Sequence, residues 1–186
     1  LALWFPLELR KGQPLVDLRT SARRPVLLTN AAAVLVGFSM YANMLVTTQQ
    51  LQLSRESGFG FGLSVLVAGL TMIPAGLAMV AAAPLSAFVT NTFGANSTMV
   101  LGCAVMAAGY MSRVMLVHTV TGIIIGAVII SVGTAVAMAA MPTLIMSNVP
   151  LTDTAAANGV NTLLRSVGTS TCSAAVATIL ASVTIR

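Results

Sequence analysis

Charged side chains are almost absent from the part of this chain that follows Pro25. Before Arg186 there are only five, and they interrupt long apolar runs: Arg55, Glu56, Arg113, Asp153 and Arg165. A charged side chain at the centre of a membrane helix costs about 2.5 to 3.5 kcal/mol on insertion scales, so charges are expected at helix ends and turns. The spacing therefore predicts a chain folded inside a lipid bilayer, with the charges marking where it surfaces.

The composition excludes a water-soluble globular domain. Hydrophobic residues make up 57% of the chain and charged residues 7%, against about 25% charged in soluble domains. Basic residues gather in the first 25 positions without interleaved aromatic residues, which favours a juxtamembrane segment over a nucleic-acid surface. The chain begins without an initiator Met or a signal-peptide pattern, so we expect a fragment of a longer protein.

The apolar runs predict an all-α fold with about five transmembrane helices. About 20 apolar residues are needed to cross the hydrocarbon core, and runs of this length are too long for barrel strands. Residues 1–25 are predicted to hold the end of a preceding helix and a basic linker, and residues 26–186 a helix bundle. The five predicted spans are 26–51, 62–89, 98–117, 120–146 and 155–185.

The distribution of basic residues predicts the orientation of the bundle. The leading segment together with Arg165 carries six Lys and Arg residues on one side of the predicted membrane. Arg55, Arg113 and Arg186 fall on the other side. Because positive charge is enriched in cytoplasmic segments, residues 6–25 are expected in the cytoplasm.

The chain contains, in this order, the stretches 68–74 (AGLTMIP), 83–86 (APLS) and 158–168 (NGVNTLLRSVG). Together they resemble the major facilitator superfamily, and within it the fourteen-helix drug:proton antiporter branch of actinobacterial type. Residues 68–74 (AGLTMIP) with 83–86 (APLS) resemble the family's tenth helix, and 87–97 lies where the family has a charged loop. The most specific stretch is 158–168 (NGVNTLLRSVG), which follows the sequence MPTL and resembles the start of the thirteenth helix. The loop keeps Gly94 but is uncharged, with Asn91 where the family usually has Asp.

The resemblance implies a fragment covering most of the C-terminal half of a bacterial plasma-membrane transporter. It implies proton-coupled export of amphipathic, often cationic, small molecules by alternating access between two helical halves. The expected partners are a small-molecule substrate, protons, the lipid bilayer and the remaining helices of the same polypeptide, with no nucleic acid. No catalytic, cofactor-binding or metal-binding motif is present, so an enzyme is not expected.

Three polar residues near the start of the last span are the candidates for a cytoplasmic gate. Asn158, Asn161 and Arg165 fall at positions i, i+3 and i+7 and share one helix face. An unpaired arginine in this position would be costly, so its donors need acceptors. Arg165 either closes the inner gate or meets substrate, or it extends to lipid headgroups or neighbouring carbonyls.

The first span carries the candidates for the wall of a substrate cavity. Tyr41 and Asn43 lie deep in the span, where polar residues are unusual against lipid. The glutamines 49, 50 and 52 lie nearer its end, and for these we favour the headgroup region.

Pro74 and Gly69 in the second span are hinge candidates. Proline removes a backbone donor and kinks helices, and Gly69 adds conformational freedom, so this region is either a moving hinge or a static kink.

Gly122 and Gly126 form a GxxxG pattern, which favours tight internal packing over dimerisation. The eleven methionines are interpreted as gap-filling residues rather than as a binding surface.

None of the five predicted spans contains Asp or Glu, so the carboxylate of a proton-coupled carrier would have to lie elsewhere in the polypeptide. Two alternatives stay open beside the exporter. One is a non-transporting or degenerate membrane scaffold, which the neutral loop at Asn91 and the missing carboxylates would suit. The other is a carrier of a nutrient, peptide or siderophore, because a fold does not fix the substrate.

Overall fold

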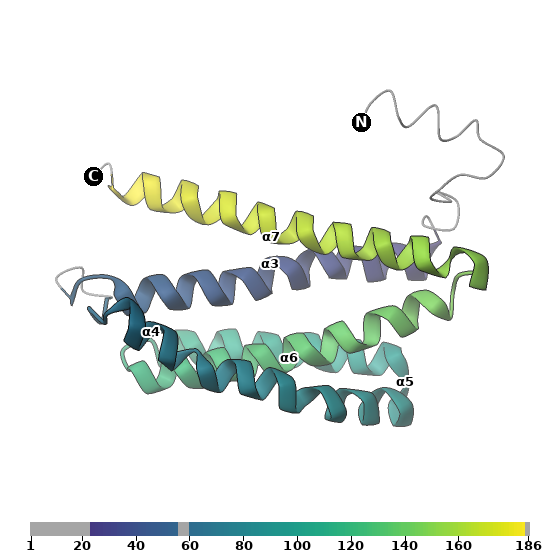
Figure 1. Cartoon of the computed structure of the whole chain (residues 1–186), viewed down its shortest axis with the longest axis horizontal. Coiled ribbons are helices and arrows are strands. Elements are labelled where there is room, and N and C mark those ends of the chain that lie inside the picture. The colour runs from purple at the N-terminus through teal and green to yellow at the C-terminus, as the bar shows by residue number, and fades with distance from the viewer. Residues whose placement is uncertain (1–22, 56–59, 185–186) are drawn as a thin grey trace.

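The computed structural model of the chain describes residues 23–55 and 60–184, and in these ranges it is helical with no β-strand. In order, the helices are α3 (Arg24–Gln52), α4 (Val65–Thr71), α5 (Ile73–Met115), α6 (Val120–Met146), the short 3-10 helix η2 (Leu151–Asp153) and α7 (Thr154–Thr184) (Figure 1). The predicted all-α membrane bundle is confirmed. The expected preceding helix end at 1–5 and most of the basic linker lie outside the described residues, as does Glu56 in the first predicted turn.

The long helices coincide with the apolar runs. By length and composition α3, the segment Val65–Met115 and α6 are each apolar enough to cross a membrane. With a rise of about 1.5 Å per residue, the 27 residues of α6 extend about 40 Å, more than the hydrocarbon core of about 30 Å. The positions at which each helix enters and leaves the bilayer stay predictions.

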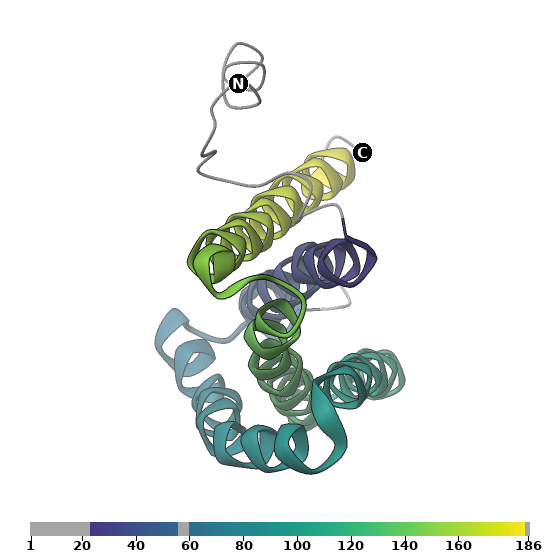
Figure 2. The ribbon, with the colours of Figure 1, turned by 90° about the vertical axis from the view of Figure 1, so that its right-hand side faces the viewer.

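Helix α5 turns back on itself at Gly94. This residue has φ 80° and ψ 159°, a conformation that glycine adopts without a steric penalty, while helical hydrogen bonding continues on both sides. The sequence predicted an uncharged loop between the spans 62–89 and 98–117, whereas the structure makes the reversal at one glycine. The two parts, which we call the first arm (73–93) and the second arm (95–115), run in opposite directions (Figures 1 and 2).

The second arm packs antiparallel to α6 through glycines on both helices. A Cβ added at Gly102 would lie 2.5 Å from the backbone nitrogen of Ala137, and one at Gly133 would lie 2.6 Å from that of Met106. Gly126, the second glycine of the GxxxG pattern, faces Arg113 in the same contact. The pattern therefore serves internal packing, as predicted.

Helix α7 lies along α3, and the two run in the same direction (Figure 1). Their backbones touch at two glycines, because a Cβ at Gly37 would overlap the carbonyl oxygen of Arg165 and one at Gly168 would overlap that of Val34. The bundle thus has two ends, which we name by residues of α3. The Arg24 end also holds Gly94 and the start of α7, and the Gln52 end holds the junction of α5 and α6.

Candidate functional site

A buried arginine of α5 is hydrogen-bonded to α3 near the Gln52 end. The sequence placed Arg113 at a turn, but in the structure it lies inside the last part of α5 with only 7% of its surface exposed. Its Nη1 donates to Thr47 Oγ1 at 2.6 Å and to Asn43 Oδ1 at 3.1 Å, and its Nη2 donates to Gln50 Oε1 at 3.4 Å. A polar cluster therefore replaces the solvated turn residue that was expected.

The acceptors of this cluster form one stripe on α3. Asn43, Thr47 and Gln50 are spaced at i, i+4 and i+7, so they share the helix face that meets the second arm. Gln50, which was expected at the depth of the lipid headgroups, accepts a hydrogen bond from Arg113, and its depth in the membrane stays a prediction. Arginine offers donors and no acceptor, so a row of side-chain oxygens is the chemical complement it requires.

The positive charge of Arg113 meets only neutral partners in the part of the chain that the structure describes. The single carboxylate in residues 23–55 and 60–184 belongs to Asp153, at the opposite end of the bundle. A buried ion without a counter-ion is expensive in a low-dielectric interior. Ionisable residues inside membrane segments mark functional sites by default, which makes this cluster the first candidate.

A cavity of about 480 Å³ opens beside the cluster, between α3, the α4 and first-arm segment, and α6. Its lining combines four of the eleven methionines with small residues and a few polar groups. The lining residues are Met40, Asn43, Met44, Thr48, Gly69, Met72, Ala75, Gly76, Met79, Ser131 and Thr134. These methionines come from α3 and from the facing segment of α4 and the first arm, so the structure gathers four of them at one surface.

Of the two predicted cavity residues, the structure places Asn43 at this cavity. Asn43 is 5% exposed and touches three helices, since its Nδ2 also donates to the backbone oxygen of Ala127 on α6 at 3.4 Å. Tyr41 is half-buried on α3 and is not among the described residues that line the cavity. The role of either residue in binding substrate stays a prediction.

The predicted hinge residues flank a real interruption of the helix. α4 ends at Thr71 and α5 begins at Ile73, with Met72 between them and Pro74 in the first turn of α5. Gly69 and Gly76 have no neighbouring atom within 4 Å of an added Cβ, so both leave space where the cavity lies. The interruption therefore lies directly on the cavity wall.

The predicted gate residues lie along the contact between α7 and α3, with different partners. Asn161 is buried and its Nδ2 donates to Asn30 Oδ1 of α3 at 3.0 Å. Asn158 donates to the oxygen of Thr154 in its own helix at 3.0 Å. Arg165 is half-buried, its side-chain stem faces Gly37, and its guanidinium has no hydrogen bond to the described residues.

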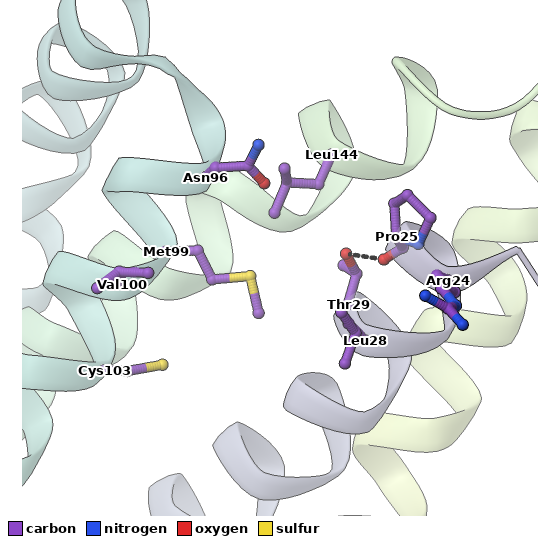
Figure 3. Close-up of a pocket in the computed structure, with 9 residues that line it drawn as sticks. All are labelled: Arg24, Pro25, Leu28, Thr29, Asn96, Met99, Val100, Cys103 and Leu144. Carbon is purple, nitrogen blue, oxygen red and sulfur yellow. Dashed lines mark hydrogen bonds between the residues drawn. The ribbon is translucent and has the colours of Figure 1, made fainter.

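A second cavity, of about 530 Å³, lies at the Arg24 end between α3, the second arm and α6 (Figure 3). Met99 and Cys103 of the second arm point toward α3 across it (Figure 3). Along α3 the two cavities are separated by Ala33 and Val36, which pack in one apolar cluster with residues of α5 and α6. An apolar cluster thus lies between the two cavities along α3.

A family model described as the Major Facilitator Superfamily matches residues 3–171, which is most of the chain. The chain belongs to the major facilitator superfamily. No curated protein and no solved structure matches it. As a member of this superfamily the chain is part of a multi-pass membrane transporter that binds small molecules, and not of an enzyme family.

Major facilitator proteins move solutes between their helices. The cavity of about 480 Å³ with four methionines, called the Met-lined cavity below, also lies between helices. Sequence reasoning missed the central role of Arg113, since hydropathy alone assigns a lone charge to a turn. The signal that could have revealed it is the row of side-chain oxygens at Asn43, Thr47 and Gln50. Such a row of acceptors in an apolar helix predicts a hydrogen-bond donor on a neighbouring helix.

Proposed function

We propose that this chain forms part of a proton-coupled exporter of amphipathic small molecules in a bacterial plasma membrane, of the fourteen-helix antiporter type. The observation that carries the proposal is the Met-lined cavity between three helices of a major facilitator chain. Thioether side chains are flexible and polarizable, so such a surface adapts to apolar bodies of different shape. A few hydroxyl and amide groups then supply orientation.

Individual residues take the roles that their positions suit. Asn43 and Tyr41 belong to the cavity region of α3, and Asn158, Asn161 and Arg165 form the gate between α7 and α3 on the cytoplasmic side. Gly69 and Pro74 supply the hinge at the helix interruption. The proton-binding carboxylate lies in other helices of the polypeptide, and residues 6–25 face the cytoplasm.

The test is dye efflux from cells that express the complete polypeptide, with and without a protonophore. Gly76→Leu adds bulk where nothing lies within 4 Å, so it should fill the cavity and lower efflux to less than about a tenth. The matched control is Ala81→Leu, which adds similar bulk at an exposed position of the same helix outside the cavity.

Efflux that collapses with the protonophore and with Gly76→Leu, but not with Ala81→Leu, supports the exporter. Equal efflux from Gly76→Leu and the parent at equal abundance would remove the cavity from the transport path. No efflux of any dye at verified membrane expression would favour a scaffold or a carrier of another solute.

The hinge is tested separately with Pro74→Ala. Restoring a backbone donor near Met72 should stiffen the interruption and slow turnover several-fold, with the apparent substrate affinity little changed. The measurement is the initial rate of efflux over a range of dye concentrations. An unaltered maximal rate would return Pro74 to static packing.

A further inference from the structure

The positive charge of Arg113 lies one side chain away from the cavity. Asn43 accepts from Arg113 Nη1 at 3.1 Å and also belongs to the cavity lining. Among the described residues, the partners Thr47, Gln50 and Asn43 supply neutral oxygens, so these three side chains solvate the guanidinium without cancelling its charge. The field of an uncancelled charge reaches the neighbouring space, and a low-dielectric wall screens it weakly.

Hydrogen bonding fixes which group of Asn43 remains for a ligand. Arg113 only donates and the Ala127 carbonyl only accepts, so the Asn43 oxygen must face the arginine and its nitrogen must face α6. That amide nitrogen carries two hydrogens, and one bond to Ala127 at 3.4 Å leaves the second unused. Asn43 therefore offers the cavity an N–H donor.

The other polar groups of the lining are of two kinds. Thr48 and Thr134 donate their hydroxyl hydrogens to Met44 and Ile130 of their own helices, each at 2.8 Å, so these two hydroxyls offer the cavity acceptor oxygens. Ser131 has no hydrogen bond among the described residues, so its hydroxyl is a second donor toward the cavity. No described lining residue carries a carboxylate that would attract a cation.

We propose that the Met-lined cavity takes an apolar solute that carries a carbonyl or carboxylate acceptor and no positive charge, with Arg113 as the residue that disfavours cations. This inference rests on the proposed transport function and narrows its substrate class. It departs from the cationic solutes that the antiporter resemblance implies, because the positive charge of Arg113 next to this cavity repels cations.

The test changes the charge of the cluster without changing its shape. Gln50→Glu keeps an oxygen in the place that accepts from Arg113 Nη2, adds a counter-ion, and lies outside the cavity lining. The matched control is Gln52→Glu, the same substitution two residues along α3, at a half-buried position with no hydrogen bond to Arg113. Arg113→Lys keeps the charge while removing the fork of donors.

The assay uses the complete protein in proteoliposomes under a pH gradient, with the membrane potential clamped. The probes are one fluorescent coumarin body that carries a carboxylate, a primary amide or a trimethylammonium group. The parent protein should move the amide or the carboxylate at least about tenfold faster than the ammonium dye. For two unit charges about 10 Å apart at an effective dielectric constant of about 20, the Coulomb energy corresponds to a rate ratio of about this size.

Gln50→Glu should reduce this preference by about tenfold, whereas Gln52→Glu and Arg113→Lys should retain it. Faster transport of the ammonium dye by the parent would overturn the inference, and so would a preference that Gln50→Glu leaves unchanged. If the amide dye is transported faster than the carboxylate dye, the recognised acceptor is a neutral carbonyl. If the carboxylate dye is faster, the recognised acceptor is a carboxylate, and either result supports the proposal.

A binding measurement distinguishes failure of the transport proposal from failure of the charge preference. If no dye shows gradient-dependent uptake, the three dyes are titrated against the purified complete protein by fluorescence anisotropy. Tighter binding of the uncharged or anionic dye, weakened by Gln50→Glu relative to the ammonium dye, would uphold the charge preference without transport. Absence of binding by all three dyes would overturn it.

Discussion

Arg113 and Arg165 are both arginines inside long helices, but their surroundings in the structure differ. Arg113 is buried and donates to three side chains of α3, whereas Arg165 is half-buried and its guanidinium finds no acceptor among the described residues. The second arm therefore meets α3 through polar side chains. At Arg165 the contact with α3 is made by its backbone and side-chain stem against Gly37.

This difference shows two ways of joining helices where lipid offers no hydrophobic driving force between them. Hydrogen-bonded side chains join α5 to α3, because in addition to the Arg113 cluster the hydroxyl of Tyr110 donates to the backbone oxygen of Ser39 at 2.7 Å. Close backbone approach at Gly37 and Gly168 joins α7 to α3, with the hydrogen bond from Asn161 to Asn30 as a side-chain link between them. The first kind of contact should depend on hydrogen-bonding chemistry, and the second on volume.

The largest effect is expected from adding volume to the α3 and α7 contact. Gly168→Ala would place a Cβ against the backbone of Val34, where no side chain can move aside, and should cost about 3 kcal/mol. Gly159→Ala on the same helix has nothing within 4 Å and should be neutral or slightly stabilising. Thermal unfolding of the purified complete protein in detergent measures both. Equal stability of the two variants would contradict contact by backbone approach.

A smaller effect is expected from removing one acceptor of Arg113. Thr47→Val keeps the side-chain volume but removes the oxygen that lies 2.6 Å from Nη1, and should cost about 2 kcal/mol, as for hydrogen bonds to charged groups. Thr48→Val is the control, because the Thr48 hydroxyl bonds only its own helix backbone among the described residues. The same unfolding measurement compares them, and a Thr47→Val protein as stable as Thr48→Val would mean that Arg113 does not depend on this acceptor.

The smallest effect on stability is expected at Arg165. Arg165→Ala removes no hydrogen bond to the described residues, so it should change the free energy of unfolding by less than about 1 kcal/mol. Dye efflux from cells expressing the complete polypeptide should nevertheless fall at unchanged abundance if the residue acts in the gate. A large loss of stability would show that Arg165 is a structural residue like Arg113, and normal efflux at normal abundance would remove it from the gate.

Much of the fold follows from the sequence because membrane helices depend on the length of apolar runs. The helical ranges of α3 and α6 agree with the predicted spans to within about two residues. The reversal at Gly94 was harder to predict, because its polar neighbours resemble a loop while they remain helical. Only a backbone angle of one glycine distinguishes the two possibilities.

The site was less predictable than the fold, because it is made by contacts between distant segments. Asn43 could be singled out as a polar residue deep in a helix, but its partner lies 70 residues away in the sequence. The four methionines of the cavity come from α3 and from the α4 and first-arm segment. Composition counts such residues without revealing which of them face each other.

The one-residue reversal at Gly94 has a consequence for how the chain is inserted into the membrane. Between Arg55 and Arg113 the sequence contains no Lys or Arg, so the reversal at Gly94 has no basic residue beside it, and the one basic residue of α5, Arg113, is buried near the far end of the second arm. The hairpin also has no loop large enough to be held back or translocated as a domain. We therefore expect the orientation of this hairpin during synthesis to depend on the segments made before and after it.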